Sequence, residues 1–128
     1  VLSSIPLDWY ARRFVETSLN FFILNPFPIP RPQVADPLRR RVIEIAARLA
    51  TQDDRFEEWA SHFKLEPKLL PEGERSDLIA ELDAAVSILY GLDAKDVRHI
   101  FETFHEGWDY EERLRAVLGH ARRFNRQA

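Results

Sequence analysis

The stretch "SDLIAELDAAVSILYG", residues 76–91, decides the fold class of this chain. Its apolar residues return every three or four positions, the spacing of one face of an α-helix. They are Leu78, Ile79, Leu82, Ala85, Val86, Leu89 and Tyr90. Gly91 follows them, and glycine often ends a helix because it adopts the left-handed backbone conformation without strain. The sequence therefore predicts a helix that begins at Ser76 and ends before Gly91.

Two further helices are predicted after this one. Asp93 is the expected cap of the first, with Asp96 in a capping-box-like position and Gly107 at its end. Residues 109–124 form the second, with acids in its first turn and arginines in its last, as the helix dipole favours. The expected inward-facing residues are Val97, Ile100, Phe101 and Phe104, then Leu114, Val117, Leu118 and Ala121.

Upstream of residue 76, two helices and a loop are predicted. Asp36 caps a helix that has Pro37 at its first position and ends near Ala50. Its apolar stripe is Leu38, Val42, Ile45, Ala46 and Leu49. Residues 53–65 predict a short helix with an aromatic face, formed by Phe56, Trp59, Ala60 and Phe63. Two prolines and a glycine in "EPKLLPEGE", residues 66–74, favour a loop.

The first 35 residues combine a helix with extended chain. Ser3 or Ser4 caps a helix from Ile5 to Glu16, and "SLNFFIL", residues 18–24, favours a brief strand. Alternating prolines from Pro26 to Pro32 then predict a stiff connector. A single strand needs a sheet to pair with. We therefore expect the rest of that sheet upstream of Val1, in a longer protein.

The resulting fold class is mainly α, with about six helices in a small bundle, one short N-terminal strand or extended segment, and a proline-rich connector. The 128 residues suit one domain, and 45% hydrophobic with 30% charged residues is ordinary for a packed globular chain. Within it, residues 1–35 are interpreted as a separate N-terminal part that ends with the connector, and residues 36–128 as a C-terminal helical domain. With no membrane-length apolar run, a soluble, cytoplasmic protein is expected.

The net charge of −3 is unevenly distributed along the chain. Residues 1–50 carry a net +3, residues 51–112 carry −11, and residues 113–128 carry +5. Basic ends permit a surface that faces a polyanion such as DNA, although arginine-rich helix faces are also commonly just solvated. There is no cysteine, which excludes disulfides, thiolate metal sites and thiol nucleophiles.

The motif "NPFP", residues 25–28, comes close to the catalytic tetrapeptide of adenine-specific DNA methyltransferases. That tetrapeptide has its aromatic residue fourth, where the ring stacks on a flipped base. Here Phe27 is third, so its ring would be misplaced. Four scattered glycines also give no glycine-rich turn for S-adenosylmethionine. No catalytic residue is assigned in this chain.

Metal and hydrolase chemistry have little support in the sequence. Glu102 and His105 form a Glu-x-x-His pair, but a di-iron site needs a second copy of it. Glu58 and His62 are four residues apart, which does not match. No Ser-His-Asp spacing or nucleophile-elbow sequence is present either. No metal ligand is assigned.

Nucleic-acid contact is the better supported site hypothesis. Arg12 and Arg13 stand among aromatic residues, a mixture that can stack on bases and bind phosphates. The alternative is that the rings are core, which we prefer for Phe14 and Phe22. The candidate DNA-binding residues are Arg12, Arg13, Ser18, Asn20, Arg39 and Arg40.

Two segments resemble the C-terminal region of type IIG restriction-modification enzymes, which are adenine-specific DNA methyltransferases. The first is "LSSIPLDWYARRFVETSLNFFILNPFPIPRP", residues 2–32. It resembles a family segment with a small polar pair, a helix with a basic pair, "LNFF" and an apolar stretch ending in Pro-x-Pro. The second is "AELDAAVSILYGLDAKDVRHIFETF", residues 80–104, where Leu-Asp-Ala leads into Leu-Tyr-Gly-Leu. Together they span roughly half of the chain.

The resemblance implies that the chain is a non-catalytic C-terminal fragment that helps DNA target recognition and positioning. Residues 1–35 would then be the end of a DNA target-recognition region with the proline-rich connector, and residues 36–128 its C-terminal helical domain. Its implied partners are double-stranded DNA and an upstream methyltransferase domain of the same chain. S-adenosylmethionine would be the cofactor of that parent protein and not of this fragment. One departure is "VETS" at residues 15–18, where the family has a glycine before "LNFF". The alternative function is a helical protein–protein interaction module with an acidic docking face and no DNA contact.

Overall fold

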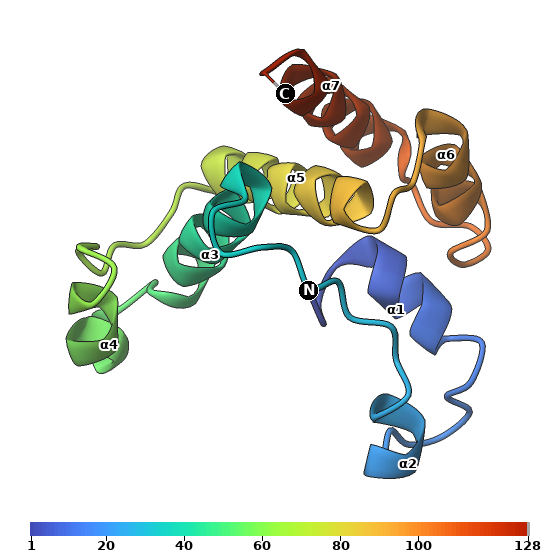
Figure 1. Ribbon diagram of the computed structural model, residues 1–128, viewed down its shortest axis with the longest axis horizontal. Helices are drawn as coiled ribbons and strands as arrows, with labels where there is room; N and C mark the ends of the chain where they lie inside the picture. Colours follow the sequence, from blue (N-terminus) through green and yellow to red (C-terminus); the bar gives the residue numbers. More distant parts are fainter. Residues whose placement is uncertain (128) are drawn as a thin grey trace.

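The computed structural model describes residues 1–127 as a mainly helical fold (Figure 1). Over this range it contains seven α-helices, one short 3-10 helix and no strand. In chain order the elements are α1 (Ile5–Ala11), α2 (Phe21–Leu24), α3 (Pro37–Ala50), η1 (Asp54–Phe56), α4 (Glu57–Ser61), α5 (Glu72–Leu89), α6 (Ala94–Glu102) and α7 (Glu111–Gln127). The predicted small helical bundle is thus confirmed.

Helix α5 lies at the centre of the bundle. It packs against α3, α7 and α1, and α6 in turn packs against α1 and α7 (Figure 1). Residues Ala80 to Ser87 are all buried, because neighbouring helices cover α5 on several sides. A helix buried all round needs apolar or small residues on most of its faces. The run "LDAAVS" provides them, apart from one aspartate.

Two clusters of buried side chains make up the core, and α5 contributes to both. The larger cluster joins α1, α5, α6 and α7 through Ile5, Ala80, Ala84, Val97, Ile100, Phe101, Leu114, Val117 and Leu118. The smaller one joins α3 to α5 through Val42, Ile45, Leu82, Ala85 and Val86. Most of the residues predicted to face inward on α6 and α7 belong to the first cluster.

Asp83 connects three helices from inside the core, where only 1% of it is exposed. Its Oδ1 accepts a hydrogen bond of 2.9 Å from the backbone N–H of Ile5, the first residue of α1. Its Oδ2 accepts from the guanidinium of Arg113 on α7, at 2.6 and 3.2 Å. Burial raises the pKa of this carboxyl, and Arg113 and the Ile5 N–H oppose that rise. A buried carboxylate with several donors both fixes and orients its neighbours.

Three predicted helix ends are confirmed, at Asp36, Asp93 and Gly91. Asp36 accepts from the N–H of Leu38 at 2.8 Å, and Asp93 and Asp96 form a reciprocal capping box at the start of α6. Gly91 directly follows the C-cap of α5 and has φ of 72°, in the left-handed region that favours glycine. These three ends are determined by local chemistry, which explains why the sequence predicts them well. The predicted end at Gly107 is wrong: Gly107 has a φ of 78° in a later turn, but α6 already ends at Glu102.

The strand predicted within residues 18–24 is wrong, because the chain forms the short helix α2 there. Asn20 caps α2, and its Oδ1 accepts from the N–H of Ile23 at 3.1 Å. A strand at this place would have no partner in the described part of the chain. A capped helical turn satisfies backbone groups locally and needs none.

The predicted helix from Ile5 to Glu16 is too long, since α1 ends at Ala11. The chain turns over Arg12 to Phe14, so Phe14 leaves the apolar face of α1. It lies instead on the surface beside Tyr10 and Phe27, with ring centroids 4.9 and 6.5 Å away. Phe14 is 52% exposed and Phe22 is 92% exposed, so the preference for both as core residues is wrong.

Two element details differ from the sequence-based expectation. Helix α5 begins at Glu72 and not at Ser76, because Pro71 precedes it and the carbonyl of Pro71 accepts from the N–H of Arg75. Part of the predicted 66–74 loop is therefore helix. On α3, Ala46 is exposed and its neighbour Ala47 is buried. The rest of the predicted stripe, Leu38, Val42, Ile45 and Leu49, does pack against α5, so only Ala46 is wrong.

Candidate functional site

Arg12 and Arg13 lie just beyond α1, each held against an aromatic ring. The Arg12 guanidinium lies 4.2 Å from the centre of the Phe104 ring, and the Arg13 guanidinium lies 4.5 Å from that of Trp9. Arg12 also pairs with Asp8 at 3.1 Å. Cation–π contacts of this kind stabilise the orientation of an arginine by about 0.5–1 kcal/mol at an exposed site. Both residues are exposed, so their orientation is restrained while their charge faces solvent.

The aromatic platform beneath these arginines is fixed by α6. Trp9 Nε1 donates to Thr103 Oγ1 at 2.9 Å, and its ring meets His99 edge-on at 6.2 Å. Trp108 lies beside Phe104, with ring centres 4.9 Å apart. The residues that support Arg12 from this side are therefore about ninety positions away in sequence. No local pattern in the sequence could have identified them.

Ser18 and Asn20 lie in the exposed segment between α1 and α2. The Asn20 Oδ1 accepts the hydrogen bond from the Ile23 N–H that caps α2, which leaves the side-chain N–H groups of Asn20 for other partners. The next two side chains are among the most exposed apolar groups of the fold, with Phe21 at 76% and Phe22 at 92%. We call Phe14, Leu19, Phe21 and Phe22 the α2 patch. It adjoins the loop that carries Arg12 and Arg13.

Arg39 and Arg40 lie in the first turn of α3, away from the α2 patch. Figure 1 places α1 and α3 on different sides of the chain's N-terminus. Arg39 lines a hollow of about 390 Å³ together with Arg31, and Arg40 is exposed. The candidate residues thus come from two parts of the fold: Arg12, Arg13, Ser18 and Asn20 from the segment between α1 and α2, and Arg39 and Arg40 from the start of α3.

The "NPFP" motif has a packing role. Phe27 is 8% exposed and its ring lies edge-on to Tyr10, with centroids 5.5 Å apart. The carbonyl of Pro28 accepts a hydrogen bond of 2.6 Å from the hydroxyl of Tyr90 at the end of α5. A ring buried in this way cannot stack on a flipped base. These contacts instead attach the proline-rich connector to α1 and α5.

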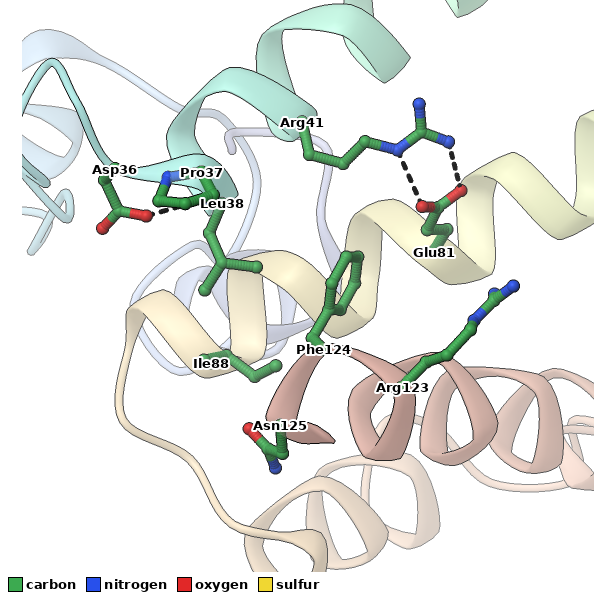
Figure 2. A pocket seen from close by; sticks show the side chains of 9 residues that line it. All are labelled: Asp36, Pro37, Leu38, Arg41, Glu81, Ile88, Arg123, Phe124 and Asn125. Carbon is green, nitrogen blue, oxygen red and sulfur yellow. Dashed lines mark hydrogen bonds and ion pairs between the residues drawn. The ribbon is translucent and has the colours of Figure 1, made fainter. Parts of the chain in front are cut away.

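A cavity that the sequence did not reveal lies between α3, α5 and α7 (Figure 2). It has a volume of about 380 Å³. Leu38, Ile88 and Phe124 supply its apolar walls, and Asp36, Arg123 and Asn125 stand at its edge (Figure 2). Its lining comes from three helices far apart in sequence, so no spacing rule could have predicted it.

An ion pair closes one side of this cavity. The Arg41 guanidinium donates to both carboxylate oxygens of Glu81, each at 2.7 Å, and these bonds raise the pKa of Arg41 (Figure 2). Only 12% of the Glu81 side chain is exposed, so the pair is partly shielded from water. Two-pronged pairing is the strongest form of this interaction. It satisfies both charges internally and leaves the cavity mainly apolar.

In residues 1–127 no three His, Cys, Asp or Glu side chains come together as a metal site would require. Glu102 and His105 are both exposed. None of the helices described is long and apolar enough to cross a membrane. Comparisons with known protein families, with curated proteins and with solved structures find no match.

Proposed function

We propose that this chain is a non-catalytic helical module of a restriction-modification adenine-specific DNA methyltransferase, where it positions the target-recognition region on DNA. The observation that supports this proposal best is the contact between the two segments that resemble the family. Asp83, of the second segment, accepts from the N–H of Ile5 in the first, and Tyr90 donates to Pro28. Segments some fifty residues apart in sequence thus form one structural unit, as parts of a shared module should.

The surface proposed to face DNA contains Arg12, Arg13, Ser18 and Asn20. The two guanidinium groups are held on aromatic rings, so little conformational entropy would be lost when they contact phosphates. Phosphate contacts of this kind set orientation and register, while base contacts set specificity. Arg39 and Arg40 form a second basic surface, which would contact the DNA phosphate backbone only if the duplex also passes along α3.

The remaining parts of the proposal concern partners. The α2 patch presents apolar side chains that an adjacent domain would cover, and we assign that place to the upstream methyltransferase domain of the same chain. S-adenosylmethionine would be bound by that domain. The protein would act in the cytoplasm, where restriction and modification of DNA take place.

The test is DNA binding by this chain as a function of salt. Affinity for a fluorescent duplex should fall steeply with added salt. Arg12→Ala/Arg13→Ala should reduce the slope by roughly two, because each phosphate contact contributes about 0.9 to it. Lys68→Ala/Arg75→Ala is a charge-matched control, because both residues are exposed and lie elsewhere. An equal effect of both double variants would show that only net charge matters, and would refute the site assignment.

A protein–protein interaction module is the second candidate, and one observation favours it. The segment around η1 and α4 projects from the bundle (Figure 1) and combines acids with exposed apolar side chains. The acids are Asp53, Asp54, Glu57 and Glu58, and the exposed apolar residues are Phe56, Trp59, Phe63 and Leu69. Such a mixture suits a basic, apolar partner surface. This function predicts that the chain shows no salt-dependent DNA binding, and that Trp59→Ser/Phe63→Ser abolishes its association with a protein partner.

A further inference from the structure

The groove between α6 and α7 gathers three arginines from two helices. Arg98 comes from α6, and Arg115 and Arg122 come from α7. The groove has a volume of about 210 Å³, and the buried side chains of Leu114 and Leu118 also line it. None of these arginines belongs to the candidate DNA-binding residues predicted from the sequence. We call this feature the α6–α7 groove.

The arginines of α7 differ in what they face. Arg113 is bound to Asp83, and Arg123 donates to the ring of His120. In contrast, within residues 1–127 none of Arg98, Arg115 and Arg122 has a carboxylate within 4.0 Å. The basic charge of this part of the chain is therefore divided into internal pairs and a solvent-facing group.

The local charge balance of the α6–α7 groove favours an anion. Three guanidinium groups share it with one carboxylate, Glu111, which forms no ion pair in the described part of the chain. Like charges that converge on one small groove repel each other unless a counter-charge lies between them. A multiply charged anion would remove that repulsion.

The backbone geometry leaves room for such an anion. Arg115 and Arg122 are seven residues apart, so they lie on one face of α7, two turns from each other. Gly119 lies between them on that face, and a Cβ placed there would meet nothing within 4 Å. The surface between the two guanidinium groups is therefore open. Arginine's planar fork of donors matches the oxygens of a phosphate group.

We infer that the α6–α7 groove is a phosphate-binding site formed by Arg98, Arg115 and Arg122. The phosphate group is provided either by a DNA backbone or by a free phosphorylated compound, since both offer the same oxygens. This inference does not depend on the proposed function, because the groove involves neither Arg12 and Arg13 nor the α2 patch.

The test is a titration of the chain with inorganic pyrophosphate, followed by NMR of the arginine Nε–Hε signals. The signals of Arg98, Arg115 and Arg122 should shift together and saturate. Arg115→Gln/Arg122→Gln should weaken binding about tenfold or more, because neither side chain can then form charge-assisted hydrogen bonds. Arg115→Lys/Arg122→Lys should recover only part of the affinity, since lysine keeps the charge and lacks the fork.

Lys68→Gln/Arg75→Gln is the matched control, with the same charge change at exposed basic residues far from the α6–α7 groove in sequence and outside its lining. It should change affinity by about twofold or less. Equal weakening by both double variants, or no saturable shift at the three arginines, would overturn the inference. If Arg115→Gln/Arg122→Gln proves unfolded by circular dichroism, Arg98→Gln carries the test in its place, with the same expected weakening.

Competition then identifies the source of the phosphate. Displacement of pyrophosphate by a DNA duplex assigns the groove to the DNA backbone, and retention in the presence of duplex assigns it to a free phosphorylated compound. Arg12→Ala/Arg13→Ala should leave pyrophosphate binding unchanged. That variant distinguishes failure of the proposed DNA surface from failure of this groove.

Discussion

Replacing Asp83 with alanine should destabilise the bundle more than any exposed substitution, because Asp83 is the buried acceptor shared by α1 and α7. The Ile5 N–H, bonded at 2.9 Å, would lack its side-chain acceptor and stay buried, which costs about 1–3 kcal/mol. Removing one partner of a buried ion pair costs about 3–5 kcal/mol. The Arg113 side chain is 36% exposed and can turn into water, so its share is smaller. We expect a total of about 2–4 kcal/mol.

This destabilisation is large enough to measure directly. For a chain of 128 residues the unfolding entropy is about 0.27 kcal/mol per kelvin, so 2–4 kcal/mol lowers the melting temperature by roughly 7–15 °C. Urea unfolding followed by circular dichroism gives the free energy, and calorimetry gives the temperature. Asp93→Ala, which removes the exposed cap of α6, is the control and should cost about 1 kcal/mol.

A cost for Asp83→Ala no greater than that for Asp93→Ala would refute this role of Asp83. That result would mean that the Ile5 N–H finds water or another acceptor, and that α1 docks on α5 through apolar packing alone. Hydrogen exchange of the Ile5 amide then shows whether its N–H has become accessible to water or has found another internal acceptor. Fast exchange in Asp83→Ala would report local opening at the start of α1, and unchanged slow exchange would report a new internal acceptor.

The titration of Asp83, the connector and the Arg41–Glu81 pair each give a further prediction. Burial raises the pKa of Asp83 above its ordinary 3.8, so its folded form binds a proton more tightly than its unfolded form. The protonated carboxyl of Asp83 therefore contributes its full stabilisation below pH 3.8, and this contribution is lost as the pH rises through the folded-state pKa. Urea unfolding at a series of pH values should show wild type losing stability relative to Asp83→Asn as the pH rises from 3.8 through that pKa. Tyr90→Phe removes the donor to Pro28 and should cost about 0.5–1.5 kcal/mol, with faster proteolysis of the connector. Arg41→Ala and Glu81→Gln should show coupling of about 1–3 kcal/mol in a double-mutant cycle, measured by urea unfolding.

The sequence predicts the helices of this fold well where local chemistry determines them. The caps at Asp36 and Asp93 and the stop at Gly91 need only neighbouring residues, and all three lie where the pattern places them. The segment from residue 12 to residue 24 is harder to predict. There aromatic and aliphatic residues favour a strand by propensity, but a strand requires a partner elsewhere, whereas a capped turn such as α2 does not.

For the candidate sites, the sequence predicts which types of residue are involved but not which distant residues they contact. The sequence indicates that Arg12 and Arg13 stand near aromatic residues, and the structure adds that Trp9 and Phe104 are the rings they contact. Phe104 is about ninety residues away from them, so its contact with Arg12 depends on how α1 packs against α6. The cavity beside Phe124 and the α6–α7 groove depend on packing in the same way. All three features depend on how the helices pack against one another, and the periodicity of the sequence does not specify that packing.

The charge pattern gains a different meaning once partners are known. The acidic middle and the basic ends partly neutralise each other inside the bundle, because Asp83 pairs with Arg113 and Glu81 pairs with Arg41. Segment totals of +3, −11 and +5 therefore overstate the charge that faces solvent. An arginine held in a buried internal pair is not free to contact phosphates, so the salt slope counts only the exposed arginines that reach them. For this reason a basic segment is informative about polyanion binding only after its internal pairs have been subtracted. Within residues 1–127 the subtraction leaves Arg98, Arg115 and Arg122, which line one groove, and also others, such as Arg13 and Arg40, which lie on other parts of the fold.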